Sequence, residues 1–349
     1  MTLPRLGVVI VTYNAANVIL DCLESLFAAR GTWLDIVVVD NESTDGTVET
    51  LRAWASGAQP YVVPRDMPFP LAPVAKPVQL NEGTQRVAGH RLTLIETDVN
   101  GGFAFGVNTG LAELAAREGI DRFWILNPDS AVPPETPHAF ASFDTGPFSL
   151  LGGRVLYYDK PDMIQIDGGR INRRTGVTDN IALFQAHADT PPPDPAGIDF
   201  IMGASIVASR AFYDAAGPMP EDYFLYYEEV DWALRRGTLP LAYCPDGIIY
   251  HRAGTAIGSA NLNRPAGPFS LYFKHRSRMR FMRRHFPVGL PTAFAYSLAK
   301  AAQLALKGYR REAWTLLLAS LNRPPPAHVR GMLSESAARR ALPEHSRRN

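Results

Sequence analysis

The strongest constraint on this chain is the alternation of apolar, strand-like runs with helix-like segments in its first half. Strand-like runs occur at 6–11, 36–39, 92–96 and 123–126, and segments with apolar residues at helical spacing lie between them. Apolar runs of this kind are typical of strands covered on both faces, and strands that alternate with helices form parallel sheets. The pattern therefore predicts an α/β fold with a doubly wound, mostly parallel sheet.

Length and composition fit one large α/β domain with an appendage. The chain has 349 residues, of which 46% are hydrophobic and 20% charged, enough to bury a full core. We expect this domain at 1–288, with a proline-rich surface insertion at 57–91, because packed elements do not tolerate prolines at that density. Turn signals between short strand-like runs at 150–183 predict a smaller antiparallel section. Two helices should follow at 289–322, and the tail at 323–349 is expected to be disordered.

The cysteines and the N-terminal segment indicate the cellular compartment of the protein. Cys22 and Cys244 lie inside apolar patterns and far apart, which predicts buried thiols in a reducing compartment. The N-terminus runs directly into an apolar strand instead of a signal peptide, and no window of about 20 residues is apolar enough to span a bilayer. We expect a cytoplasmic protein, at most peripheral on the inner face of the cell membrane. The sequence leaves its oligomeric state open.

The charges are unevenly distributed, although the net charge is only +1. No Asp or Glu occurs from Gly247 to Arg311, whereas Lys and Arg are frequent there. At 272–284 the cations alternate with apolar residues, and helical spacing would give an apolar stripe with cationic flanks, as in helices that lie on anionic lipid. The alternative is a core-packing helix with solvated charges. Because no nucleic-acid-binding motif accompanies the charge, we expect an anionic membrane surface as partner and no nucleic acid.

Polar clusters follow the four predicted parallel strands at the point where each strand ends. They are Thr12-Tyr13-Asn14, Asp40-Asn41, Asp98 to Gly102, and Asn127-Pro128-Asp129. In open α/β sheets, ligands bind beyond the carboxyl ends of the strands. A single Asp at such a place is commonly a cap or turn residue, but four clusters at one edge indicate a ligand site.

Each cluster has a chemical use toward a nucleotide. The Asp40 carboxylate can accept a hydrogen bond from a uracil or thymine N3–H or from a ribose hydroxyl. Gly101-Gly102 would let the backbone approach a nucleotide closely. Asn127 and Asp129 place an amide oxygen and a carboxylate two residues apart, which suits a hard divalent ion shared with a diphosphate.

Together these motifs resemble those of the family 2 glycosyltransferases with the GT-A fold. The similar segments, in the family's order, are Val9 to Asn14, Val37 to Thr47, Asn100 to Gly110, and Leu126 to Asp129. The last two resemble the bacterial rhamnosyltransferase-like branch, where Asn-Pro-Asp stands in for the Asp-x-Asp that holds metal and diphosphate. The likeness covers 5–285 apart from the insertion. It implies a GT-A fold with an antiparallel section on the acceptor side and C-terminal helices, and an inverting sugar transfer from a nucleotide carrier.

The resemblance implies a donor site and an acceptor site. For the nucleotide sugar it implies contacts from Thr12, Tyr13, Asn14, Asp40, Asn100, Gly102, Phe103, Asn108, Asn127 and Asp129. For the acceptor it implies Gly203, Ala204 and Trp232, with the small residues leaving room for a sugar.

Three carboxylates, Glu228, Glu229 and Asp231, lie near the start of a predicted helix at 226–236. Acidic residues there commonly stabilise the helix dipole. In similar enzymes the matching segment is E-D-x-D, whose second acid takes the proton from the acceptor hydroxyl. Glu229 has that position, with Glu228 and Asp231 as supports. The family more often has Asp there, and the extra methylene moves the carboxylate by about one bond length, a displacement to which rates are sensitive.

His251 ends an apolar strand-like run at 248–250. A single histidine at such a place is commonly a packed or capping residue. Related enzymes place a metal-binding histidine about 20 residues after the base, so the resemblance implies that Asp129 and His251 hold Mg²⁺ or Mn²⁺, whose charge stabilises the leaving diphosphate.

Several alternatives stay open at this point. The donor is dTDP-rhamnose by resemblance, with UDP-sugars as competitors, and the acceptor is a lipid-linked or polysaccharide glycan. Rival functions are a catalytically silent sugar-nucleotide-binding protein and a polyprenyl-phosphate glycosyltransferase. A nicotinamide-dependent oxidoreductase is disfavoured, because no Gly-x-Gly-x-x-Gly follows the first strand.

Overall fold

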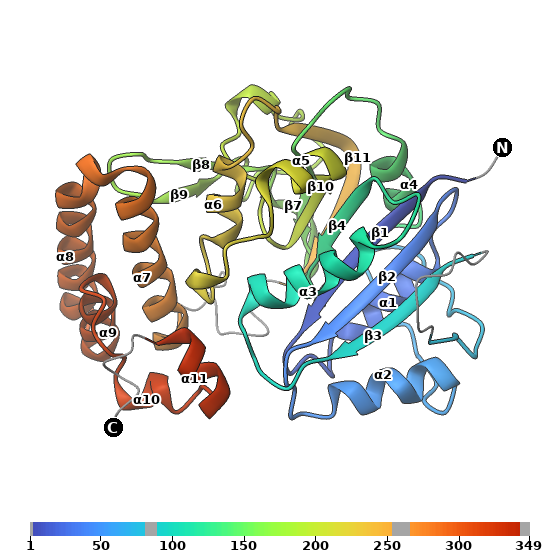
Figure 1. Cartoon of the computed structure of the whole chain (residues 1–349), viewed down its shortest axis with the longest axis horizontal. Coiled ribbons are helices and arrows are strands. Elements are labelled where there is room, and N and C mark those ends of the chain that lie inside the picture. Colours follow the sequence, from blue (N-terminus) through green and yellow to red (C-terminus); the bar gives the residue numbers. More distant parts are fainter. Residues whose placement is uncertain (1–2, 81–88, 253–265, 343–349) are drawn as a thin grey trace.

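The computed structural model describes residues 3–80, 89–252 and 266–342. Within these residues a nine-stranded sheet runs through the larger part of the molecule, and a group of helices forms the other end (Figure 1). Eight of its strands follow the order β3-β2-β1-β4-β10-β6-β11-β5, and β7 pairs with β6. The predicted α/β class is therefore confirmed.

The first half of the chain forms the parallel part of the sheet. Its strands, in spatial order, are β3 (Arg91–Glu96), β2 (Trp33–Asp40), β1 (Arg5–Thr12) and β4 (Arg122–Leu126). The register pairs Thr12 with Asp40 and Asp40 with Glu96, so the carboxyl ends of these strands lie at one edge. The predicted polar clusters consequently meet there.

The second half adds mainly antiparallel strands. They are β5 (Ser130–Ala131), β6 (Leu150–Tyr157), β7 (Lys160–Ile166), β10 (Ser205–Ser209) and β11 (Ala242–His251). β10 runs antiparallel to β4 and β6, whereas β6 and β11 are parallel. A separate two-stranded antiparallel sheet is formed by β8 (Gly169–Ile171) and β9 (Thr178–Asn180).

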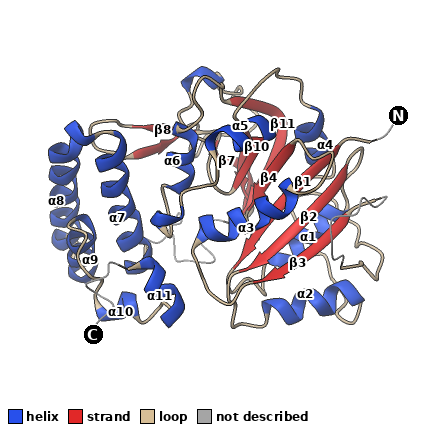
Figure 2. Cartoon of the chain, in the orientation of Figure 1, coloured by secondary structure: helices blue, strands red, loops and turns tan. Residues whose placement is uncertain are grey.

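Helices cover both faces of the sheet, as the doubly wound pattern requires (Figure 2). They are α1 (Ile19–Phe27), α2 (Thr47–Ser56), α3 (Phe103–Ala115), α4 (Thr136–Ser142), α5 (Arg210–Ala216) and α6 (Glu228–Leu234). Alternate residues of one strand enter opposite cores: Val9 packs with α3, and Val8 packs with α1. Gly110 lets α3 approach β1 closely, because a Cβ there would lie 2.5 Å from a methyl of Val9.

In the predicted insertion at 57–91, the described residues 57–80 and 89–90 contain no helix or strand, and 81–88 lie outside the described part. The predicted boundary was one residue too long, because Arg91 begins β3. The insertion is nevertheless tied to α1. Lys76 Nζ lies 2.7 Å from the buried carboxylate of Glu24, and Tyr61 donates a hydrogen bond of 2.8 Å to Asp21. The segment therefore packs along α1.

The C-terminal helices form a layered group beside α6 (Figure 1). They are α7 (Pro268–His285), α8 (Leu290–Leu306), α9 (Arg310–Ser320), α10 (Ala327–Arg330) and α11 (Glu335–Ala341). The prediction of disorder at 323–349 was wrong for α10 and α11, since Val329, Ala337 and Ala341 are buried in an apolar cluster. Residues 343–349 lie outside the described part.

The prediction that 272–284 forms a lipid-facing helix was also wrong. The apolar residues of α7, such as Phe273 and Phe281, are buried in the core. Its cations bond within the protein: Arg276 Nε donates to Asn322, and Arg278 donates to Ser297 Oγ at 2.5 Å. The apolar residues of α7 and two of its cations are therefore internal, whereas Lys274, Arg283 and Arg284 are exposed.

Both cysteines are buried, with free thiols, as predicted. In the described part of the chain, every helix is too short or too polar to cross a membrane.

Candidate functional site

The edge where β1 and β2 end holds Asp40 in a fixed orientation. Thr12 Oγ1 donates to Asp40 Oδ1 at 2.8 Å, and the Ser43 backbone N–H donates to Oδ2 at 2.9 Å. The side chain is only 3% exposed. Each carboxylate oxygen has a second lone pair, so Asp40 can still accept a hydrogen bond from a ligand at this edge.

Tyr13 and Asn14 follow Thr12 at the same edge, and both are half-buried. Asn14 joins the loops after β1 and β2. Its backbone N–H donates to Ser43 Oγ at 2.8 Å, and its side-chain oxygen accepts from the Thr44 backbone N–H at 2.8 Å. Asn14 thereby fixes the loop after β1 against the loop after β2.

The loop after β3 is closed by Asn100 and Gly102. Asn100 Oδ1 accepts from the Gly102 N–H at 3.0 Å, and Asn41 Nδ2 donates to the Gly102 carbonyl at 2.9 Å. Gly102 has φ +89°, and a Cβ there would lie 2.3 Å from the Phe224 carbonyl oxygen. Gly102 is thus required because the backbone of Phe224, just before α6, lies close to it. The sequence had instead predicted a close approach of Gly102 to a nucleotide.

The loop after β2 contacts the C-terminal end of the described chain through Glu42. Glu42 Oε2 accepts hydrogen bonds from Ser334 Oγ (2.8 Å), Ser336 Oγ (2.6 Å) and the Asn100 N–H (3.0 Å). Burial by itself raises the pKa of Glu42, but these three donors outweigh it and lower the pKa below its ordinary value. The carboxylate is therefore held ionised beside the predicted donor site.

A second constellation forms where β4 ends and β5 pairs with β11. The register places Ser130 opposite His251, and Asp129 Oδ1 lies 3.2 Å from His251 Nε2. Both side chains are buried. Asn127 Nδ2 lies 3.3 Å from the same ring nitrogen. The sequence therefore predicted correctly that Asn127, Asp129 and His251 come together.

Gln165 on β7 orients the histidine. Its Oε1 lies 2.9 Å from His251 Nδ1, and an amide oxygen only accepts, so Nδ1 donates to Gln165 and Nε2 is left facing Asp129. Such a partner on the second ring nitrogen is typical of metal-binding histidines. The sequence did not predict Gln165.

This pair fits a divalent ion with few protein ligands. Among the described residues, no group of three or more His, Cys, Asp and Glu side chains could hold a metal ion. Adjacent ligands about 2.1 Å from an octahedral ion lie about 3 Å apart, close to the Asp129–His251 distance. Mg²⁺ or Mn²⁺, which keeps most of its positions for water and phosphate oxygens, suits such a donor set.

The start of α6 has a strained backbone. Phe224, Tyr226 and Tyr227 have φ values of +67°, +65° and +72°. Each such residue costs on the order of 1–3 kcal/mol, and strain of this kind is concentrated at functional sites. The surroundings hold it in place: the Phe224 carbonyl accepts from the Phe103 N–H at 3.0 Å, and Ser277 Oγ donates to the Leu225 carbonyl at 2.9 Å.

Glu229 follows this segment and lies beside the predicted acceptor residues. A Cβ added at Gly203 would lie 3.5 Å from the Phe103 ring and 3.9 Å from the Glu229 carboxyl carbon. The Ala204 carbonyl accepts from the Asn127 N–H at 3.0 Å. The segment 203–204 therefore lies next to both the Glu229 carboxylate and Asn127, which is close to His251.

The two neighbouring glutamates differ in their surroundings. Glu228 is buried, and its Oε2 has no hydrogen-bond partner among the described residues. Burial and then the charge of Glu229 raise the pKa of Glu228 well above its ordinary value, which favours its neutral form. Burial also raises the pKa of Glu229, against the lowering effect of its backbone hydrogen bonds and Lys274. Glu229 is the ionisable member of the pair.

Asp231 points into a different cluster. Its carboxylate accepts hydrogen bonds or pairs with Tyr223, Arg235, Arg284 and His285 at 2.7–3.0 Å. Burial by itself raises the pKa of Asp231, but these donors outweigh it and lower the pKa to about 2. The structure thus separates Asp231 from Glu229 and gives it an anchoring role between α6 and α7.

Two other predicted residues lie away from any ligand surface. Trp232 is fully buried, packs against Phe212 and donates its indole N–H to the Gly217 carbonyl, so the prediction that it contacts an acceptor was wrong. The Asn108 amide bonds to both backbone groups of Met219, which leaves it tying α3 to that loop.

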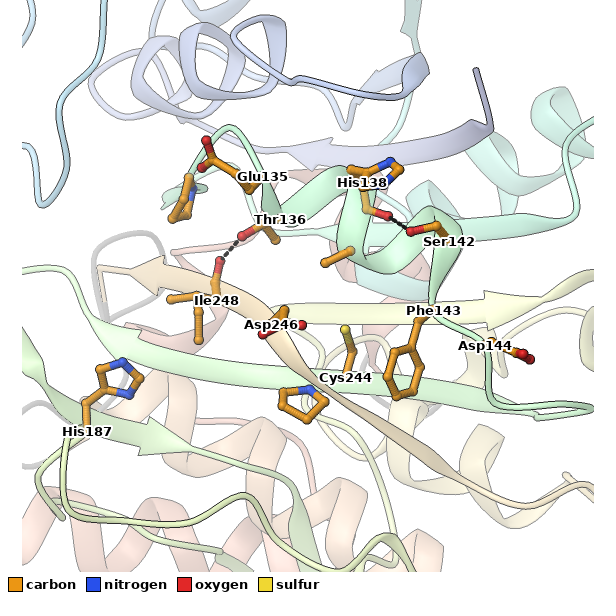
Figure 3. A pocket seen from close by; sticks show the side chains of 13 residues that line it. Glu135, Thr136, His138, Ser142, Phe143, Asp144, His187, Cys244, Asp246 and Ile248 are labelled. Carbon is orange, nitrogen blue, oxygen red and sulfur yellow. Dashed lines mark hydrogen bonds between the residues drawn. The ribbon is translucent and has the colours of Figure 1, made fainter. Parts of the chain in front are cut away.

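A groove of about 790 Å³ lies elsewhere, between α4 and β11 (Figure 3). His138, Phe143, His187 and Cys244 line it, and burial raises the pKa of the Cys244 thiol to about 11. None of the predicted site residues lines this groove. The strand edge and the start of α6 therefore remain the candidate site.

Residues 7–66 match the sequence model of the family Glycosyl transferase family 2. A search of curated protein sequences found no match.

Solved glycosyltransferases have a similar fold. Mannosyltransferase PcManGT from Pyrobaculum calidifontis, in complex with GDP-Man and Mn²⁺, is 17% identical over 92% of this chain and 87% of that chain, with a TM-score of 0.51. TarS 1–349 from S. aureus, in complex with UDP-GlcNAc, is 14% identical over 97% and 88%, with a TM-score of 0.52. GalNAc-T7 with UDP, GalNAc and Mn²⁺ is 11% identical over 89% and 54%, with a TM-score of 0.52. The chain thus has the GT-A fold of these structures, and its first strand–helix–strand segment carries the sequence pattern of glycosyl transferase family 2.

Proposed function

We propose that this protein is an inverting glycosyltransferase that moves a sugar from a nucleotide diphosphate to a glycan acceptor. The observation that carries the proposal is the position of Glu229. A half-buried carboxylate lies beside Gly203, and the adjoining Ala204 contacts the segment that leads to Asp129. A direct displacement at a sugar carbon requires a base for the attacking hydroxyl and a group that binds the leaving diphosphate. Glu229 and the pair Asp129–His251 would supply these two functions, next to the same small-residue segment 203–204.

The donor would bind along the strand edge. Asp40 accepts from the nucleoside, and Asn100, Gly102 and Phe103 complete the wall between β3 and α6. Asp129 and His251 would hold Mg²⁺ or Mn²⁺, with Gln165 orienting the imidazole. When bound, the ion neutralises negative charge that develops on the leaving diphosphate. The GDP-Man and UDP-GlcNAc complexes of the similar structures, one of them with Mn²⁺, support a nucleotide-sugar donor.

Glu229 is the proposed general base. It removes the proton from the acceptor hydroxyl as that oxygen attacks the anomeric carbon, and the nucleotide leaves from the opposite face. Its raised pKa brings the carboxylate closer to the basicity useful near neutral pH. The raised pKa of Glu228 disfavours a second negative charge that would repel the donor. Asp231 positions the start of α6 through its ion pairs with α7.

The finer assignments follow from the motif resemblance. We propose dTDP-rhamnose as donor, with UDP-sugars as competitors, and a lipid-linked or polysaccharide acceptor in the biosynthesis of cell-envelope polysaccharide. The rhamnosyltransferase-like segments are Asn100 to Gly110 and Leu126 to Asp129.

Isothermal titration with dTDP-rhamnose, UDP-glucose, UDP-galactose, GDP-mannose and NADH, in Mn²⁺ and in EDTA, tests the proposal. We expect one nucleotide sugar to bind in Mn²⁺, and its binding to be lost in EDTA and in Asp129→Ala. A matched control is Asp246→Ala, which removes a carboxylate from the groove of Figure 3 and should leave affinity unchanged. Binding of NADH and of no nucleotide sugar would contradict the proposal.

A further inference from the structure

The α8–α9 hairpin presents an apolar face to solvent. We call this set the α8–α9 face, and its exposed or half-buried members are Pro291, Ala295, Leu298, Ala299, Ala302, Ala305 and Leu306 on α8, and Trp314, Leu317, Leu318 and Leu321 on α9. Leu306 is 89% exposed, Trp314 is 59% exposed and Leu321 is 54% exposed. On each helix the spacing places these residues on the side opposite the buried positions. Exposed apolar groups gathered in this way indicate a contact surface.

The charges around this face have one sign. The turn between the helices carries Lys307, Arg310 and Arg311, all exposed. Between Gly247 and Ser334 the sequence contains a single acidic residue, Glu312. A partner for this face must therefore supply both an apolar layer and negative charge.

We propose that the α8–α9 face docks on an anionic lipid bilayer surface. Aliphatic side chains enter the boundary between headgroups and acyl chains, Trp314 and Tyr309 suit the interfacial layer, and the three cations meet anionic headgroups. A second copy of the chain fits less well. A two-fold pairing would bring the cationic turn of each copy toward the same face of the other copy, where Glu312 is the single acid that could neutralise it.

The position of α8 links this face to the candidate site. α7 packs between α8 and the start of α6, where Phe281 contacts Tyr227 with ring centroids 5.4 Å apart. Packed helices lie 8–10 Å apart, so docking through α8 places Glu229 roughly 20 Å from the lipid surface. An acceptor held by a lipid diphosphate would thus reach the base. The docking itself does not depend on the proposed function.

Vesicle binding by the full chain tests this inference without donor or acceptor. We would mix the protein with phosphatidylcholine vesicles containing 0% or 30% phosphatidylglycerol, and measure co-sedimentation and tryptophan emission. Trp54, Trp124 and Trp232 are fully buried and Trp33 is half-buried, so the part of a blue shift that is lost in Trp314→Phe reports on Trp314. We expect binding and a blue shift with the anionic vesicles, and loss of most of the shift in Trp314→Phe.

Two variants separate the apolar and the charged contributions. Leu298→Ser with Leu306→Ser should weaken binding at least tenfold. Lys307→Gln with Arg310→Gln and Arg311→Gln should weaken it on the order of 100-fold, since each cation near an anionic surface contributes about fivefold. The matched controls are Val62→Ser and Arg65→Gln, exposed residues of the insertion on the α1 side, which should change nothing.

Three outcomes would overturn the inference. The first is no binding to anionic vesicles. The second is a loss in the control variants as large as in the α8–α9 variants. The third is a dimer of the wild type in light scattering, together with a monomeric Leu298→Ser, Leu306→Ser variant whose vesicle binding is unchanged. That result would assign the face to contact with a second copy.

Discussion

Three acids at the start of α6 lie within one helical turn and have three different environments. Glu228 is buried and its Oε2 has no hydrogen-bond partner in the described part of the chain, Glu229 faces Gly203, and Asp231 is surrounded by cationic and hydroxyl donors. Spacing alone does not distinguish them, because the differences come from what α7 and the loop before α6 bring near each one. Their different environments lead to different expected effects of substitution.

Asp231→Asn should destabilise the fold in a pH-dependent way. The folded-state pKa is lowered from 3.8 to about 2, so the stabilisation is present above about pH 4 and is lost as pH falls toward 2. A shift of this size corresponds to about 2 kcal/mol. Urea unfolding at pH 7 and pH 3 should show a smaller difference from wild type at pH 3. Asp214→Asn, at an exposed ion pair with Arg210, should cost under about 1 kcal/mol, and an equal cost at both sites would contradict the assignment.

Glu229→Gln should lower kcat by about 10²–10⁴-fold, while the donor Kd changes little, because a base acts on the transition state. The matched control is Glu228→Gln, which puts a neutral amide where the raised pKa already favours a neutral acid, and which should keep most activity at neutral pH. Since the pKa of Glu229 is raised, wild-type kcat should fall on acidification at a higher pH than an ordinary glutamate would give. Equal losses of kcat in both variants would contradict the assignment of Glu229 as the general base.

At this scale the sequence predicted the residues whose neighbours are set by strand ends, such as Asp40, Asn127 and Asp129. His251 was predicted from the resemblance, and its pairing with Asp129 is confirmed by the structure. Gln165 could not be predicted, because a single glutamine within a strand has no motif and reaches His251 only across the sheet. Trp232 was misassigned because adjacency in sequence to Glu229 does not show which side of α6 faces the core.

At the scale of elements, loops are fixed by contacts between distant segments. α11 reaches the loop after β2, where Ser334 and Ser336 donate to Glu42, and Arg340 lies over the Phe105 ring with 4.4 Å to its centroid. No local pattern at 334–340 indicates such a partner, so the tail was taken as disordered. α7 was misread for a related reason. Its cations resemble a lipid-facing flank, and only the fold shows that Asn322 supplies an oxygen to Arg276 and that Ser297 and Thr175 supply oxygens to Arg278.

Ser334→Ala with Ser336→Ala should weaken donor binding about tenfold and should also lower the free energy of unfolding, because Ser334 caps α11 as well as bonding to Glu42. The substitutions remove two of the three donors that hold Glu42 beside Asn100, and a hydrogen bond to a charged group contributes about 1.5–3 kcal/mol. Titration of the donor in Mn²⁺ measures the effect. Ser142→Ala, which removes a hydroxyl bonded to its own helix, is the control. An unchanged Kd would limit α11 to a packing role.

For the molecule as a whole, donor and ion should act together as stabilisers. Ligand that binds only the folded state at 100 times its Kd raises stability by about 2.7 kcal/mol. The thermal midpoint should therefore rise with nucleotide sugar plus Mn²⁺, and the rise should disappear in EDTA and in Asp129→Ala. A rise that survives both treatments would show that binding does not use the Asp129–His251 pair.

The fold class was predictable because alternating strands and helices constrain a sheet strongly, and the solved structures share that fold at 17% identity or less. The second half was harder to predict. β6 lies between β10 and β11 although both follow it in the chain, and long-range pairings of this kind leave little trace in local sequence.

The contact between Glu42 and α11 also bears on biosynthesis. Ser334 and Ser336 follow Glu42 in the chain by 292 and 294 residues, so the ribosome makes them much later than the parallel strands. A nascent chain can thus form the parallel sheet early and still lack two of the donors that set the loop after β2. The donor edge reaches its final shape only when residues 334–336 have been made, so a chain truncated before them is expected to be folded but poorly able to bind its ligand.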